Sequence, residues 1–131
     1  MKKLLLLFMF FPLFSYAQLT SGVYNIVKHI SVVDNEEMFG TDKMLGTSFF
    51  IVDIEHSLIS FTASDYVVAI YEITETVKTE ETVLYICREK KTGRTIRLMF
   101  QPNKKVEDSG ELMISQSSTW FDFFTILKIE Q

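Results

Sequence analysis

The amino-acid sequence predicts one small, mainly antiparallel all-β domain behind a short export signal. Two observations lead to this prediction. Apolar residues come in short runs rich in Val, Ile, Phe, Tyr and Thr, and charged or turn-forming clusters separate these runs. No internal repeat or flexible linker divides the chain. The expected architecture is a single meander barrel or a two-layer sandwich of about eight strands.

The first expected element is a cleavable signal peptide at residues 1–17. Two lysines lie at its start, residues 4–14 form an apolar run, and the signal ends at Ala17. The apolar run is too short to cross a bilayer as a helix, which takes roughly 17 to 25 residues. Gln18 follows the expected cut, and without a cysteine there no lipid anchor is expected. We therefore expect a mature domain of residues 18–131 in the periplasm or outside the cell.

The mature chain is expected to form eight strands. Each is a short run in which β-branched and aromatic residues dominate. In chain order they run from Gly22 to Val33, Thr47 to Ile54, Ser57 to Thr62, Tyr66 to Thr74, Thr82 to Glu89, Arg94 to Gln101, Glu111 to Ser115 and Phe121 to Glu130.

The links between these strands predict a run of antiparallel hairpins. The clearest is Lys90-Lys91-Thr92-Gly93, because glycine accepts the positive φ of a tight hairpin and the lysines stay in water. Short links at residues 55–56 and 63–65 predict two further hairpins. The segment from Glu107 to Gly110 predicts a second glycine-bearing turn. Together these turns favour a meander.

Two segments have more than one interpretation. Between Asp34 and Gly46, a capping residue, an acidic first turn and a partial apolar face predict a short helix near 34–45 or an ordered loop. Residues 118–128 fit a helix or a strand. We favour the strand, because β-branched and aromatic residues dominate, and one face would then carry Phe121, Phe123, Thr125, Leu127 and Ile129.

Some strands are apolar on both faces. Neither the strand from Tyr66 nor the run from Phe49 to Val52 alternates between apolar and polar residues. A sheet with one face in water should alternate. We therefore expect the central strands to be covered on both sides, by a sheet that curls on itself, by the segment from Asp34 to Gly46, or by another subunit.

A small barrel of this kind resembles the lipocalin-type barrels in outline. The resemblance is one of architecture only. Gly22 is followed by Val23 and Tyr24, so the Gly-x-Trp motif near the start of that family is absent. The sequence therefore assigns the chain to no family.

Charge and cysteine content narrow the partners and the chemistry. Loss of the signal's two lysines would leave eleven basic residues against seventeen acidic ones, a net charge near −6. Nucleic acid and anionic lipid need a positive face, so neither is expected as a partner. Cys87 is the single cysteine, so the chain cannot form an internal disulfide. Its apolar neighbours predict a buried side chain rather than a nucleophile.

Catalytic and metal-binding motifs are missing from the sequence. We find no phosphate-binding glycine loop, nucleophile elbow, metalloprotease helix or cysteine pair for zinc. Asp53, Glu55 and His56 are a weak metal candidate, and an exposed strand end that closes into a turn explains them better. His29 is expected to be solvated or hydrogen-bonded. No cofactor is expected.

The aromatic and doubly apolar segments suggest a function. We expect an exported, non-enzymatic binding protein that holds an apolar or aromatic small molecule in a barrel pocket. The candidate ligand-binding residues are Phe50, Val68, Trp120 and Phe124. The first alternative is a protein-interaction or structural module of the cell envelope, whose apolar surface binds a protein partner or a second copy. The second alternative is an exported hydrolase.

Overall fold

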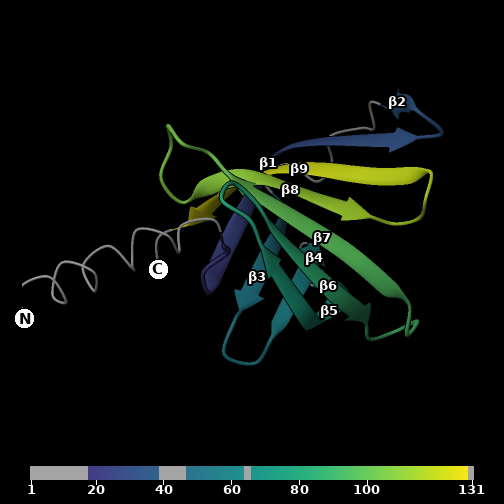
Figure 1. The fold of residues 1–131 in the computed structure, drawn as a ribbon, viewed down its shortest axis with the longest axis horizontal. Coiled ribbons are helices and arrows are strands. Elements are labelled where there is room, and N and C mark those ends of the chain that lie inside the picture. The colour runs from purple at the N-terminus through teal and green to yellow at the C-terminus, as the bar shows by residue number, and fades with distance from the viewer. Residues whose placement is uncertain (1–17, 39–46, 64–65, 130–131) are drawn as a thin grey trace, which may run out of the picture.

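The computed structural model describes residues 18–38, 47–63 and 66–129 (Figure 1). These residues form nine strands and no helix, and the strands pair only in antiparallel fashion, which confirms the all-β prediction. The strands are β1 (Gly22–Val33), β2 (Glu36–Met38), β3 (Ser48–Asp53), β4 (Leu58–Ala63), β5 (Tyr66–Lys78), β6 (Val83–Glu89), β7 (Thr95–Pro102), β8 (Ser109–Ser115) and β9 (Trp120–Ile129).

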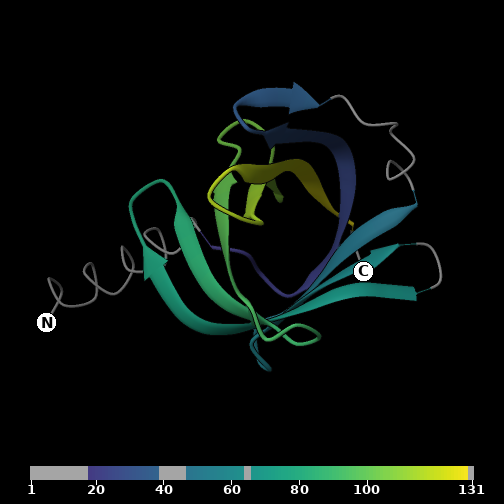
Figure 2. The ribbon, with the colours of Figure 1, turned by 90° about the vertical axis from the view of Figure 1, so that its right-hand side faces the viewer.

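Eight of these strands close into one up-and-down barrel (Figures 1 and 2). β1 and β3 to β9 follow one another around the ring, and β1 closes it by pairing with β9 from Val23 opposite Ile129 to Val33 opposite Trp120. β2 is an extra strand that pairs with the end of β1. Of the two architectures expected from the sequence, the structure is therefore the single barrel.

Three β-bulges bend the longest strands. The extra residues are Val27 in β1, Val68 in β5 and Thr74 in β5, each of which interrupts the register with a neighbouring strand. A bulge increases the local twist and turns the following side chains to the other face. These bends allow the strands to curl into a closed ring.

The core fills the inside of the barrel. Along β6 and β7, odd-numbered residues from Val83 and even-numbered residues from Ile96 point inward and are buried. At the centre, the ring of Phe50 lies 5.1 Å from Phe61 and 5.0 Å from Phe124. Aromatic contacts of this kind are stabilising beyond the apolar area that they bury.

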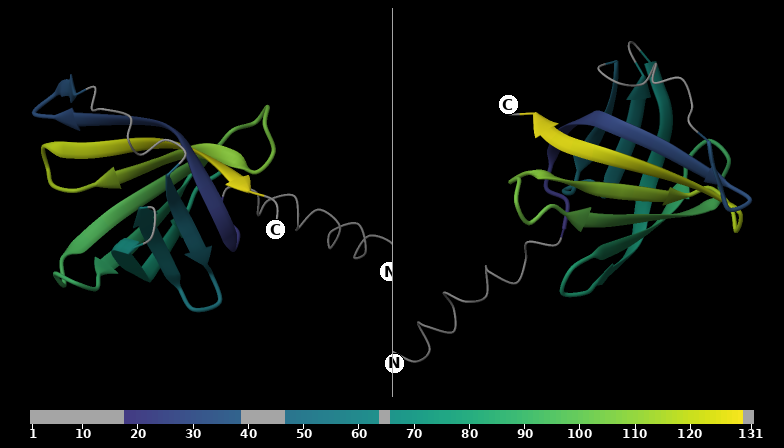
Figure 3. Two further views of the ribbon diagram at one scale, coloured as in Figure 1. Left: turned by 180° about the vertical axis from the view of Figure 1, so that it is seen from behind. Right: turned by 90° about the horizontal axis from the view of Figure 1, so that it is seen from above.

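Leu19 closes one end of the barrel. Its side chain is buried, and its backbone N–H donates a 2.9 Å hydrogen bond to the hydroxyl of Tyr85. We call this the Leu19 end, where β1 begins and β9 ends. At the opposite end, which we call the Asp122 end, the β1–β2 and β8–β9 hairpins lie side by side (Figure 3).

The short helix expected near residues 34–45 is wrong for the described part of that segment. Asp34 and Asn35 both have positive φ, 51° and 66°, and form a tight two-residue turn between β1 and β2. Such a turn suits Asp and Asn, because both tolerate left-handed φ and the turn matches strand twist. Residues 39–46 lie outside the described residues. The preference for a strand in 118–128 is confirmed by β9.

The expected hairpins form, although one glycine has a different role. Gly93, with φ of 73°, turns between β6 and β7 as predicted. Between β7 and β8 the residue with positive φ is Asp108, and Gly110 lies within β8. A Cβ on Gly110 would come within 2.6 Å of the Phe100 ring, so the missing side chain makes room for that ring.

Curling of the sheet into a barrel buries only its inner face. On β3, Phe50 and Val52 are buried, whereas Ile51 between them is exposed. On β5, Val67 and Val68 are both exposed, because the bulge directs both outward. The described residues of one chain therefore do not cover the second apolar face that the sequence shows.

Candidate functional site

Inward-facing side chains become more accessible toward the Asp122 end. On β9, Ile126 and Phe124 are buried, whereas Trp120 in the same row exposes 45% of its surface. On β4, Ile59 is buried and Phe61 is half-buried. The inward rows of β4 and β9 are therefore less covered at the Asp122 end than at the centre of the barrel.

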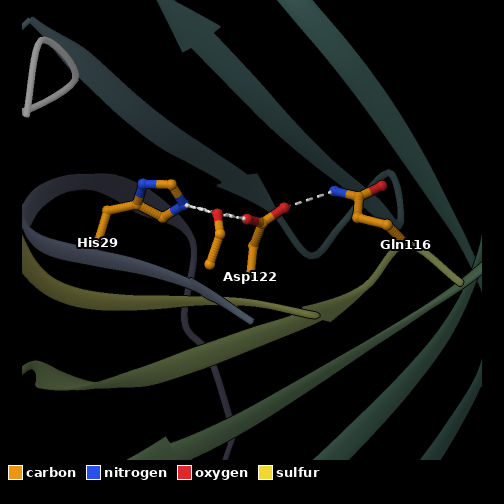
Figure 4. A network of polar contacts seen from close by, with 4 residues as sticks. His29, Gln116 and Asp122 are labelled. Atoms are coloured by element: carbon orange, nitrogen blue, oxygen red, sulfur yellow. Dashed lines mark hydrogen bonds and ion pairs between the residues drawn. The ribbon is translucent and has the colours of Figure 1, made fainter. Parts of the chain in front are cut away.

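A network of polar side chains lies on the inner wall at this end (Figure 4). His29 and Ser31 come from β1, where the bulge at Val27 turns them inward, and Asp122 faces them from β9. His29 Nε2 lies 3.1 Å from Asp122 Oδ1, and the Ser31 hydroxyl donates to the same oxygen. Gln116 Nε2 donates to Asp122 Oδ2 over 3.1 Å. We call these four residues the Asp122 network.

The Asp122 network fixes the proton of His29. A carboxylate only accepts hydrogen bonds, so the nitrogen that faces Asp122 carries the hydrogen. The Ser31 oxygen lies 3.2 Å from the same Nε2 and shares that hydrogen. The other ring nitrogen of a neutral imidazole is then an acceptor. It points away from Asp122 in Figure 4, and no described residue bonds to it.

The arrangement differs from that of a nucleophilic Ser–His–Asp triad. In such a triad the imidazole uses one nitrogen for the serine and the other for the carboxylate. Here Nε2 of His29 faces both partners, and the Ser31 hydrogen goes to Asp122. The imidazole is therefore not placed to take the serine proton. The geometry suits a structural and ligand-facing role for the three residues.

Tyr71 adds a neutral donor from the opposite wall. Burial raises the pKa of Tyr71 to about 12, and the charges of Glu89 and Asp122 act in the same direction, while a hydrogen bond with Gln116 opposes them. Its hydroxyl therefore stays protonated at ordinary pH. The carboxylate of Glu89 accepts from Thr92 N–H over 2.7 Å and from the Thr92 hydroxyl, which lowers its pKa.

Two of the four predicted ligand-binding residues meet in the core. Phe50 and Phe124 are buried and contact each other edge to face. His29 stacks on the other side of Phe124, with ring centroids 4.6 Å apart. Phe124 therefore forms the floor beneath the Asp122 network. Phe50 lies below it and does not face solvent.

The other two predicted residues lie elsewhere. Trp120 is on the inward row of β9 at the rim of the Asp122 end. Val68 is the bulged residue of β5 and is exposed. The structure therefore brings Trp120 and Phe124 to the same end of the barrel and does not bring Val68 to them.

The weak metal candidate of the sequence forms an exposed turn. His56 Nδ1 lies 2.7 Å from Asp53 Oδ2, and both side chains are well exposed between β3 and β4. Glu55 has no bond to either of them. Within the described ranges, no three His, Cys, Asp or Glu side chains are close enough to hold a metal ion.

Cys87 lies in the core on β6, as its apolar neighbours predict. Burial raises the pKa of its thiol to about 12. The thiolate, which is the nucleophilic form, is therefore disfavoured.

Two hollows are open to solvent, one on the outer wall and one at the Leu19 end, where the inward side chains of Tyr24 and Phe100 line it. The larger, of about 650 Å³, lies at the Leu19 end between Gln18, Thr20, Tyr24 and the loop from Asn103 to Asp108. The smaller, of about 300 Å³, lies against the outer side of β1 and β9, beside Lys28, Ile30 and Phe123. Charged and polar side chains line a large part of both hollows, so neither matches the apolar pocket expected from the sequence.

Sequence reasoning missed the Asp122 network. The face of β9 that it grouped, from Phe121 to Ile129 in odd numbers, points outward, and Asp122, Phe124 and Ile126 point inward. The only signal in the sequence was Asp122, an acidic residue between aromatic ones. The sequence does not show which face of β9 points inward, so this signal could not be interpreted.

No protein-family model, curated protein or solved structure in the comparisons matches this chain. Among the described residues, the structure has no helix with the length and apolar character needed to cross a membrane.

Proposed function

We propose that this chain is an exported, non-enzymatic binding protein that takes a small apolar or aromatic molecule into the Asp122 end of its barrel. The observation that carries the proposal is the change in exposure along the inward rows, from buried Ile126 to exposed Trp120 on β9. The signal pattern at residues 1–17 supports export.

The ligand sits at the mouth rather than at the centre of the barrel. The centre is filled by Phe50 and Phe124, together with Phe61 against them. Protein interiors are close-packed, so an apolar guest cannot enter that layer without moving side chains. Above it, Trp120 offers an apolar wall, and the stacked pair of His29 and Phe124 forms the base.

The base also defines one polar requirement of the ligand. Nε2 of His29 is occupied by Asp122 and Ser31, and the remaining ring nitrogen can accept one hydrogen bond. A few placed polar groups among apolar walls are typical of small-molecule sites. The best ligand is therefore a flat, mostly apolar molecule with one N–H or O–H group.

The test uses the fluorescence of Trp120, which is the only tryptophan of the chain. N-phenyl-1-naphthylamine, an apolar aromatic probe with one N–H group, should quench Trp120 and gain emission of its own when added to the exported protein. Ala63→Phe should abolish this uptake, because Ala63 points inward at the rim and is half-buried. Far-ultraviolet circular dichroism checks that the variant is folded.

Val77→Phe is the matched control. It adds the same ring to β5, the strand next to β4, on the outward side of the barrel. Probe uptake should be unchanged in this variant. Equal uptake in the native protein and in folded Ala63→Phe would place the probe elsewhere and refute the proposed site.

A further inference from the structure

The outer face of the barrel from β9 to β5 is apolar, and none of the described residues packs over it. Exposed large apolar side chains gather there: Val27, Ile51, Val67, Val68, Leu127 and Ile129. We call these six residues the apolar strip. Single exposed apolar residues are common, whereas a contiguous group on one face marks an interaction site.

The register shows that the apolar strip is continuous across five strands. One row pairs Ile129 with Val23, Val23 with Ile51, Ile51 with Ser60 and Ser60 with Ile70. The next row runs from Leu127 through Asn25, Phe49 and Thr62 to Val67. Neither row contains a charged residue.

Two polar atoms in the second row have no partner. Asn25 Oδ1 and Thr62 Oγ1 are buried and bond to no other described residue, and both flank Phe49 in the register. Buried polar atoms without a partner are uncommon in native proteins. Both atoms are covered within the single chain, so they add no exposed polar surface to the apolar strip.

We propose that the apolar strip is the contact between two copies of this chain. The chain carries a net charge of −4, with 17 acidic residues, so most faces of two copies repel each other. The two rows have no carboxylate and can meet without that repulsion. A pleated apolar sheet face packs best on another such face, and a second copy supplies one.

The charges at the two ends of the apolar strip complement each other. Lys28 on β1 borders it toward the Asp122 end, and no described residue forms an ion pair with it. Asp53 on β3 borders it toward the Leu19 end, where its exposed carboxylate also faces His56. A twofold axis across the strands places Lys28 of one copy near Asp53 of the other. Interfaces with this symmetry use the same patch on both copies.

The first experiment measures the mass of the exported protein by light scattering at increasing micromolar concentration. The native protein should have twice the mass of one chain. Ile51→Lys and Val67→Lys should each reduce it to the mass of one chain, because both put a charge into the interface. Both sites are exposed, at 41% and 52%, so the variants should fold.

Matched controls come from apolar residues away from the strip. Val77 on β5 and Val106 in the β7–β8 loop expose 42% and 47% of their surface. Val77→Lys and Val106→Lys should remain dimers. The proposal would be overturned if the native protein stayed a monomer at every concentration. Binding of the monomer to neutral lipid vesicles would then show that the apolar strip has another partner. A dimer that persists in Ile51→Lys and Val67→Lys would also overturn the proposal.

A charge exchange tests the antiparallel arrangement of the two copies. Lys28→Asp and Asp53→Lys should each weaken the dimer about tenfold or more, and the combined variant should restore it, because opposite charges across an interface set its register. Failure of the combined variant to recover would overturn this arrangement.

Discussion

At the scale of single residues, the chain contains two histidine–aspartate pairs with opposite surroundings. His56 and Asp53 are closer, at 2.7 Å, but their side chains are 72% and 45% exposed. His29 and Asp122 are 3.1 Å apart with 13% and 9% exposed. Water screens the first pair, whereas the second lies where an unpaired charge is costly. Burial, rather than distance, therefore decides which pair stabilises the fold.

Asp122→Asn should destabilise the fold by about 1–3 kcal/mol, because one or more buried donors would lose their acceptor. Asp122 accepts hydrogen bonds from Ser31, His29 and Gln116. The amide of asparagine has only one acceptor oxygen, and its NH2 group cannot accept. Asp53→Asn is the control and should change the free energy of unfolding by at most about 0.5 kcal/mol. Urea titration followed by circular dichroism measures both. Equal effects of the two variants would contradict this account.

Alkaline pH should weaken the folded state through three buried groups. Burial raises the pKa of Cys87 from 9.0 to about 12, and those of Tyr71 and Tyr85 from 10.0 to about 12. Between pH 9 and 12 the unfolded chain loses these protons and the folded chain keeps them. The free energy of unfolding should therefore fall as pH rises through this window.

Urea titrations at pH 8, 9, 10 and 11 measure this loss. Cys87→Ala removes the group with the largest shift and should make the decline between pH 9 and 10 less steep. A free energy of unfolding that stays constant up to pH 11 would show that the three groups ionise as easily in the folded chain as in the unfolded chain.

At the scale of elements, two glycines are needed for different reasons. Gly110 in β8 has no room for a Cβ, which would lie 2.5 Å from the Gln101 carbonyl oxygen and 2.6 Å from the Phe100 ring. Gly93 has open space around it but a φ of +73°. Gly110→Ala should cost about 1–3 kcal/mol by overpacking. Gly93→Ala should cost about 1–2 kcal/mol through its backbone conformation.

Asparagine distinguishes the two causes, because it tolerates left-handed φ but is larger than alanine. Gly93→Asn should recover most of the lost stability, and Gly110→Asn should be worse than Gly110→Ala. Thermal unfolding of the four variants provides the comparison. Recovery at Gly110 would mean that the backbone, not the Phe100 ring, limits this position.

Every strand except β2 could be predicted from the sequence, because β-branched and aromatic runs between turns indicate strands whatever their partners. The direction of each face could not. On β9 both rows are aromatic, and on β5 Val67 and Val68 both point outward because of a bulge that leaves no clear sequence signal. The helix expected after Asp34 does not form in the described residues, because Asp34 and Asn35 have positive φ and reverse the chain into β2.

At the scale of the whole molecule, one pairing, between β1 and β9, closes the sheet into a barrel rather than a sandwich. No local pattern indicates it, since the partners are far apart in sequence. The Asp122 network depends on the same pairing, because His29 and Ser31 reach Asp122 only across it. Sequence alone could therefore name Trp120 and Phe124 as candidates, but not the polar residues beside them.

The pairing of first and last strands also sets the order in which the molecule can assemble. From β3 to β9, each strand pairs with the next one in the chain, and β1 pairs with β3 across β2. By contrast, His29 and Asp122 are 93 positions apart. Closing so long a loop is entropically slow, so the hairpins form before the ring does. A chain whose last strand is not yet free to pair remains an open sheet, with the free edges of β1 and β8 able to template aggregation. Release of the last strand is then the step that ends this vulnerable period.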